Sequence, residues 1–130
     1  MTRYVLLHHD WPTVHYDLMI EVDGELYTWR LPSPLSPGEQ LIERIANHRL
    51  EYLNYEGPVS NNRGQVKRFA KGNYVVVQFN QDEYQLNLTG DLQGHINLQR
   101  YQPDALARDA SRAQNVSAYA APWLLVWMPS

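Results

Sequence analysis

Apolar and polar residues alternate along much of this 130-residue chain, and a period of two is typical of β-strands. The alternation is clearest over residues 14–22 (VHYDLMIEV), which the turn Asp23-Gly24 joins to a second run at 25–31. Further β-branched or aromatic runs occupy residues 3–9, 73–79, 83–90, 95–101 and 122–127. Several short strands at this spacing predict a mainly all-β fold, a small antiparallel β-barrel that is closed or nearly closed.

Two stretches depart from this alternation and predict one or two short helices. Residues 36–39 (SPGE) combine a capping Ser, a Pro at the first helical position and a Glu at the third, so a helix through about residue 46 is expected. Residues 103–114 (PDALARDASRAQ) are rich in alanine and favour a helix or an ordered surface excursion.

The composition is that of one globular domain over residues 1–130, in which residues 103–121 form an excursion before the last strand. The absence of cysteine excludes disulfides and thiolate metal sites, so any metal must be held by His, Asp or Glu. The first residues contain no apolar run long enough for a signal peptide or a membrane span. The chain is therefore expected to be cytoplasmic, without a membrane partner.

The net charge of −3 excludes a generally basic nucleic-acid-binding protein. The charge is uneven, however, because Arg63, Lys67, Arg68 and Lys71 lie together with no acidic residue among them. This stretch is either a solvated hairpin or an edge that contacts phosphate groups.

Three of the five histidines and two aspartates fall within residues 7–17 (LHHDWPTVHYD). On a strand, His15 and Asp17 project from the same face, about 7 Å apart along the chain. His9 ends the preceding strand, and a short connection can bring it beside them. Two imidazoles and one carboxylate are a common set of ligands for a divalent metal. The alternative is a half-exposed strand whose polar face lies in water.

Two blocks of residues resemble the 3′-phosphoesterase domain of bacterial and archaeal DNA ligase D. The first is His9 followed by residues 15–21 (HYDLMIE), Gly24 and Trp29, and the second is residues 48–57 (HRLEYLNYEG). The segment GQVKRFAKGNY and the final PWLLVW are similar to later parts of the family pattern. The resemblance covers about residues 3–101 and the last strand.

The resemblance implies a small β-barrel with a central metal site, and extended structure where the helix after Ser36 is expected. His9, His15 and Asp17 would bind one divalent cation, Mn²⁺ by family preference, with Zn²⁺ or another ion as the alternative. His48 and Tyr52 would reach the phosphate as catalytic residues. The implied activity is removal of a ribonucleotide or a phosphate from nucleic-acid 3′ ends, on DNA or RNA–DNA primers, in DNA repair; no repair partner is indicated.

The sequence departs from the family pattern at three positions, where Met19, Ser33 and Gln40 replace basic residues. Arg30, Arg49 or the basic stretch at 63–71 could supply the lost charge, and Glu21 could orient a ligand histidine. The main rival to a phosphoesterase is an inactive module that binds metal and nucleic acid. A third reading is a metal enzyme with a non-phosphate substrate. A basic side chain close to the metal ligands would favour the phosphoesterase.

Overall fold

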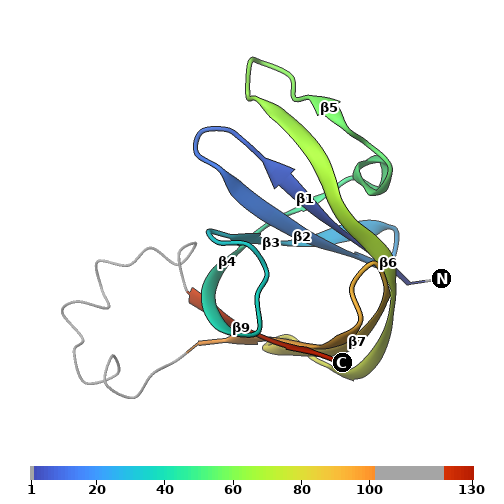
Figure 1. The fold of residues 1–130 in the computed structure, drawn as a ribbon. Coiled ribbons are helices and arrows are strands. Elements are labelled where there is room, and N and C mark those ends of the chain that lie inside the picture. Colours follow the sequence, from blue (N-terminus) through green and yellow to red (C-terminus); the bar gives the residue numbers. More distant parts are fainter. Residues whose placement is uncertain (1, 102–121) are drawn as a thin grey trace.

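A computed structural model describes residues 2–101 and 122–130, and the expected excursion with its predicted helix lies outside these ranges. Eight antiparallel strands follow one another in the order β1-β2-β3-β4-β9-β8-β7-β6, and β6 pairs back onto β1 to close the predicted barrel (Figure 1). The short strand β5 pairs with β6 alone. The strands are β1 Arg3–His9, β2 His15–Val22, β3 Glu25–Leu31, β4 Gly38–His48, β5 Gly57–Pro58, β6 Gln65–Phe79, β7 Glu83–Gly90, β8 Gly94–Arg100 and β9 Pro122–Pro129.

The predicted Asp-Gly hairpin is confirmed between β2 and β3. Asp23 and Gly24 both have positive φ, 50° and 85°, as a two-residue turn of this hand requires. The turn sets Val22 opposite Glu25, and the whole register of the two strands follows from that pair. No helix among the described residues is long and apolar enough to span a membrane.

The interior of the barrel is filled by the inward side chains of all eight strands. Tyr4 and Leu6 of β1 and Leu18 and Ile20 of β2 are at most 1% exposed there. Aromatic residues complete this core. Trp29, Tyr84 and Trp123 pack with ring centroids 5.2 to 6.0 Å apart.

A second, smaller apolar cluster lies on the opposite face of β1 and β2. Val5, Leu7 and Met19 pack there against Leu53 and Val66. Leu53 belongs to η1, a short 3₁₀ helix over Leu50–Leu53 that lies with β5 above these strands (Figure 1). This part of the sheet is therefore buried on both faces, by the barrel core on one side and by the segment between β4 and β6 on the other.

The helix expected after Ser36 is wrong, because residues 38–48 form strand β4. Gly38 has a φ of +104°, which does not begin an α-helix. β4 pairs with β3 on one side and with β9 on the other, so Ile42 is buried while its neighbour Leu41 is exposed. Pairing on both edges overrides the local helix signal. The only helical element in the described ranges is η1.

Candidate metal centre

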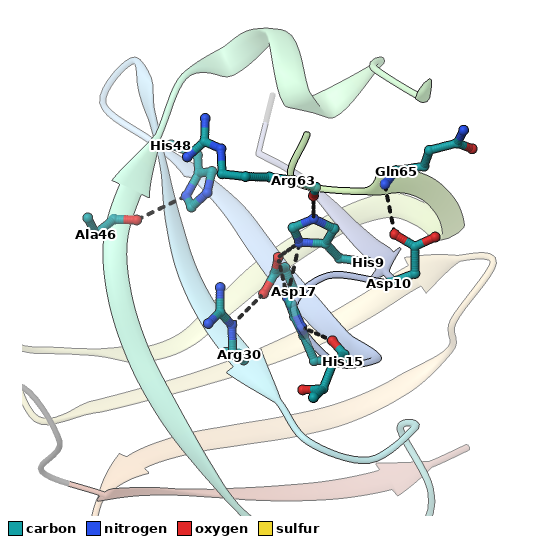
Figure 2. A network of polar contacts seen from close by, with 10 residues as sticks. His9, Asp10, His15, Asp17, Arg30, Ala46, His48, Arg63 and Gln65 are labelled. Atoms are coloured by element: carbon teal, nitrogen blue, oxygen red, sulfur yellow. Dashed lines mark hydrogen bonds and ion pairs between the residues drawn. The ribbon is translucent and has the colours of Figure 1, made fainter. Parts of the chain in front are cut away.

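The turn between β1 and β2 brings the three predicted ligands together. His9 and His15 are directly opposite each other in the antiparallel pair, and Asp17 lies on the same face of β2, opposite Leu7. His9 Nδ1 and His15 Nε2 are 3.2 Å apart, and Asp17 Oδ2 lies 3.5 Å from His15 Nε2 and 4.0 Å from His9 Nδ1 (Figure 2). The predicted pairing of the two strands is thus confirmed. The cluster lies on the face of the outer apolar cluster, whereas the resemblance implied a central position in the barrel.

Two backbone carbonyls determine which nitrogen of each histidine carries the proton. His15 Nδ1 lies 2.8 Å from the Thr13 carbonyl oxygen, and His9 Nε2 lies 2.7 Å from the Arg63 carbonyl oxygen. A carbonyl only accepts hydrogen bonds, so both of these ring nitrogens must donate. In the neutral rings the facing nitrogens, His9 Nδ1 and His15 Nε2, therefore each present a lone pair.

Three electron-pair donors thus face one another, the two imidazole nitrogens and one carboxylate oxygen. No hydrogen lies between them when both rings are neutral, and this arrangement calls for a cation. Ligand atoms about 2.1 Å from one divalent ion stand roughly 3.0–3.4 Å apart. The observed separations of 3.2 and 3.5 Å fit that spacing, and 4.0 Å needs only a small side-chain adjustment. The donor set therefore fits a divalent metal.

Arg30 places a positive charge directly beside this cluster. It is the cross-strand neighbour of Asp17, and its Nε lies 3.6 Å from Asp17 Oδ1. Both atoms are buried and neither has a hydrogen-bond partner. Such buried atoms leave hydrogen-bonding capacity on both side chains that a further group at this site could satisfy. Asp17 is only 3% exposed, and Arg30 offsets part of the cost of burying its carboxylate.

The loop after His9 is tied to the turn between β5 and β6. Asp10 Oδ1 accepts a hydrogen bond from the Gln65 backbone N–H at 2.8 Å (Figure 2). Gly64, with a φ of +76°, packs so closely that a Cβ there would overlap Asp10 and Trp11. This contact positions the neighbouring Arg63 carbonyl against His9.

His48 and Tyr52 line the same pocket as His9 and Asp17, two of the three residues of the cluster. The pocket holds about 350 Å³, and His9, Asp17, Arg30 and Arg63 also line it. His48 Nδ1 donates to the Ala46 carbonyl oxygen at 3.0 Å, which leaves Nε2 as the nitrogen able to exchange a proton. Burial lowers the pKa of His48 below its usual value of 6.5. The His48 ring meets the Tyr52 ring edge-on, with centroids 5.4 Å apart.

Glu21 and Arg49, two further residues predicted to act at the site, pair with other side chains instead of with the His9–His15–Asp17 cluster. Glu21 accepts two hydrogen bonds from the Arg3 guanidinium, both 2.9 Å, which lower the pKa of its carboxyl. It makes no contact with the histidines among the described hydrogen bonds and ion pairs. The Arg49 side chain is 81% exposed and pairs with Glu51 at 2.8 Å. Of the basic residues proposed to replace the missing charge, Arg30 is the one whose charged side chain pairs with the cluster among the described ion pairs.

The three positions that depart from the family pattern also differ in their surroundings. Met19 is 1% exposed and belongs to the outer apolar cluster, although it also lines the pocket. Ser33 is exposed in the connection between β3 and β4, and the Gln40 amide donates to the Ser33 and Pro34 carbonyls. Neither Ser33 nor Gln40 lines the pocket of the cluster.

Sequence reasoning did not find the Thr13 and Arg63 carbonyls. Every residue has a carbonyl, so no residue type signals this role. The contact of Arg30 with Asp17, in contrast, can be predicted from the sequence. A two-residue turn at Asp23-Gly24 places residue 22 opposite 25 and therefore residue 17 opposite 30.

Comparison with known proteins agrees with the two motif blocks. The family model of the DNA Ligase D 3′-phosphoesterase domain matches residues 7–100. The multifunctional non-homologous end joining protein LigD of Pseudomonas aeruginosa is 34% identical over 62 residues, which is 45% of this chain and 7% of that protein. The corresponding DNA repair protein of Mycobacterium tuberculosis is 29% identical over 98 residues, which is 70% of this chain and 13% of that protein. The matches thus span only a small part of these relatives.

Proposed function

The chain belongs to the DNA ligase D 3′-phosphoesterase domain family, and on that premise we propose that it is a metal-dependent phosphoesterase. Its substrates are nucleic-acid 3′ ends that carry a ribonucleotide or a phosphate, or a related phosphoester. The observation that carries the proposal is the meeting of three electron-pair donors beside Arg30. Two of these donors, on His9 and Asp17, belong to a pocket that His48 and Tyr52 also line.

His9, His15 and Asp17 would hold the metal, with Mn²⁺ as the expected ion. A divalent ion held there would supply polarisation of a phosphoryl oxygen and a lowered pKa of a bound water. The Thr13 and Arg63 carbonyls keep both imidazoles in the tautomer that points a lone pair at the ion. When metal binds, the two imidazoles would keep these carbonyl contacts, and only the 4.0 Å separation between His9 and Asp17 would need a small adjustment.

Arg30 binds and orients the phosphate. A guanidinium presents several N–H donors in a fixed plane, which suits the oxygens of a phosphoester. Arg30 reaches the pocket from β3, whereas the family pattern has its arginine two residues after the aspartate, where this chain has Met19. The two positions lie on neighbouring strands, so the positive charge is kept close to the aspartate from a different strand.

His48 and Tyr52 handle protons and hydrogen bonds at the reacting group. At neutral pH the lowered pKa keeps His48 Nε2 unprotonated. It can then take a proton from the attacking water and return it to the oxygen that leaves phosphorus, which balances the hydrolysis. The Tyr52 hydroxyl can donate a hydrogen bond to a phosphoryl oxygen as charge develops there.

One observation favours the rival, a binding module without activity. Met19 is built into the outer apolar cluster, so the arginine of the family pattern is replaced by a side chain with a structural role. Arg30 weighs against this rival, because a basic side chain beside the predicted metal ligands supplies the positive charge that Met19 lacks. A metal enzyme with a non-phosphate substrate is disfavoured because Arg30 and Arg63 both line the pocket.

The test is hydrolysis of a primer–template with one 3′-terminal ribonucleotide and, separately, one with a 3′-phosphate. Wild type and His15→Ala would be assayed with and without Mn²⁺, and metal binding measured by calorimetry. We expect turnover that requires metal and is lost with His15. Folded, metal-loaded wild type that cleaves neither substrate would leave the binding module as the better account.

A further inference from the structure

A second pocket lies directly beside the candidate metal centre. It holds about 490 Å³ and is formed by the β1–β2 connection, the end of β3, the middle of β4 and the first residue of β9. The predicted metal ligand His15, the first residue of β2, also lines it. Pro12 and Arg30 line both this pocket and the pocket of the metal centre. A ligand bound through one end at the metal centre can therefore extend past Arg30 into the second pocket.

The wall of the second pocket is mostly apolar. Val14 and Leu41 are 56% and 51% exposed there, so two large apolar side chains face solvent on the outer surface of the barrel. A flat, weakly polar group stacked on them would remove this surface from water. The apolar residues of the lining are Pro12, Val14, Pro32, Leu41, Ile42 and Pro122.

The pocket has one positive and one negative side chain. Arg30 borders the metal centre, and Glu43 is its cross-strand neighbour on β4. Glu43 takes part in none of the ion pairs found within the described ranges. Its carboxylate can therefore accept a hydrogen bond from a ligand amine or hydroxyl. These features match the parts of a nucleotide. The guanidinium suits its phosphate, the apolar wall suits the faces of its base, and the carboxylate suits its hydrogen-bond donors.

We propose that the second pocket binds the nucleoside attached to the scissile phosphoester. The phosphate lies on the Arg30 side, the base packs against Val14 and Leu41, and Glu43 accepts a hydrogen bond from the base or the sugar. The volume is within the range of about 300–1,000 Å³ common for small-ligand pockets. This assignment rests on the proposed phosphoesterase function, and it adds where the substrate's nucleoside is recognised.

The test distinguishes where the nucleoside binds from where the phosphate binds. Amide NMR spectra of protein loaded with Zn²⁺, the diamagnetic alternative to Mn²⁺, would be recorded with adenosine, with inorganic phosphate and with adenosine 3′-monophosphate. We expect adenosine to shift the amides of residues 41–43, whereas Thr13 and Val14 adjoin His15 and should respond to either ligand. Phosphate should shift only the surroundings of the metal ligands and His48, and the mononucleotide should shift both sets.

A matched pair of variants tests the apolar contact. Leu41 and Met128 are both 51% exposed on strands, but Met128 lines neither pocket. Leu41→Gln should weaken adenosine 3′-monophosphate binding about fivefold, as expected for one lost apolar contact, without changing phosphate binding. Met128→Gln should bind both ligands as wild type does.

Two results would overturn the assignment: adenosine that shifts none of these amides, or Leu41→Gln that binds the mononucleotide as wild type does. The primer–template assay distinguishes this failure from that of the proposed function. Hydrolysis of the primer–template without adenosine binding would contradict the nucleoside pocket but not the phosphoesterase. Adenosine binding without any hydrolysis would support the nucleoside pocket and contradict the phosphoesterase.

Discussion

The side chains of the candidate metal centre are oriented by hydrogen bonds to the backbone. Each of the two predicted ligand histidines donates one N–H to a carbonyl, so that its other nitrogen faces the partner ring. Arg30 and His48 are held in the same pocket by neighbouring strands, Arg30 through β3 and His48 at the end of β4. Their proposed roles differ, so substitutions should separate them.

Arg30→Ala should lower kcat/KM about 10- to 100-fold, the usual loss when a charged hydrogen bond to the substrate is removed. Metal affinity should not fall, because a positive charge next to Asp17 opposes binding of a cation. Steady-state kinetics and metal titration together check this. Arg49→Ala is the control, since that side chain is exposed and paired with Glu51. If Arg30→Ala lost metal and activity together, its role would be structural.

The rate should depend on pH through His48. Because burial lowers the pKa of His48, the ring is neutral at pH 7 and becomes protonated only below pH 6.5. If Nε2 accepts the proton of the attacking water, kcat falls as pH falls through that lowered pKa. His48→Gln should reduce kcat by about 10²- to 10⁴-fold and remove this acid limb. Metal occupancy must be measured at each pH. If kcat of His48→Gln still falls at low pH while the metal occupancy is constant, a group other than His48 causes the fall.

At the scale of elements, the site depends on how the β5–β6 turn packs on the β1–β2 connection. Asp10 binds the Gln65 backbone, and Gly64 lies against Trp11. The Arg63 carbonyl lies in this turn and accepts the His9 N–H. A substitution in the turn should therefore change the metal affinity of the candidate centre, although no residue of the turn is a predicted ligand.

Gly64→Ala should destabilise the fold by about 1–3 kcal/mol, because a Cβ at positive φ is strained and here also meets Asp10 and Trp11. Metal affinity should fall as well, since the Arg63 carbonyl is displaced. Gly24→Ala is the control: its φ is also positive, +85°, but nothing lies within 4 Å of the added Cβ. It should cost stability without affecting metal binding. Equal metal affinity in the two variants would show that the turn does not position His9. Urea denaturation and calorimetric metal titration measure the two effects.

At the scale of the whole molecule, buried tyrosines link strands across the barrel. The Tyr74 hydroxyl of β6 donates to the Glu21 carbonyl oxygen of β2 at 2.6 Å. The Tyr4 hydroxyl of β1 donates to the Thr89 carbonyl oxygen of β7 at 2.8 Å. Both phenols are removed from water, which disfavours their ionised forms.

Stability should fall at high pH, and part of that fall should depend on Tyr74. Burial raises the pKa of Tyr74 from 10.0 to about 12. The unfolded chain therefore loses this proton at lower pH than the folded protein, so the folded state loses stability as pH rises from 10 toward 12. Tyr74→Phe should weaken this dependence and cost about 1 kcal/mol at neutral pH. Urea denaturation at pH 8, 10 and 11 measures it. Some slope should persist because burial also raises the pKa of Tyr4, whereas an unchanged slope would contradict the role of Tyr74.

The sequence by itself determined the features that depend on neighbours in the chain. Alternation predicted most of the strands, and the Asp-Gly turn defined one hairpin and its register. The five residues between His9 and His15 are enough to set two ligands opposite each other, and Asp17 follows two positions on. These relations hold because strand period and turn length act over a few residues.

Only the tertiary structure decided the features that join distant segments. The pairing of β1 with β6 closes the barrel across some 60 residues, and β4 becomes a strand because β3 and β9 lie on either side of it. The Arg63 carbonyl reaches His9 only when the β5–β6 turn folds over β1. Such contacts form when the whole chain buries its apolar side chains together, and a local pattern contains no information about which distant backbone group will be near.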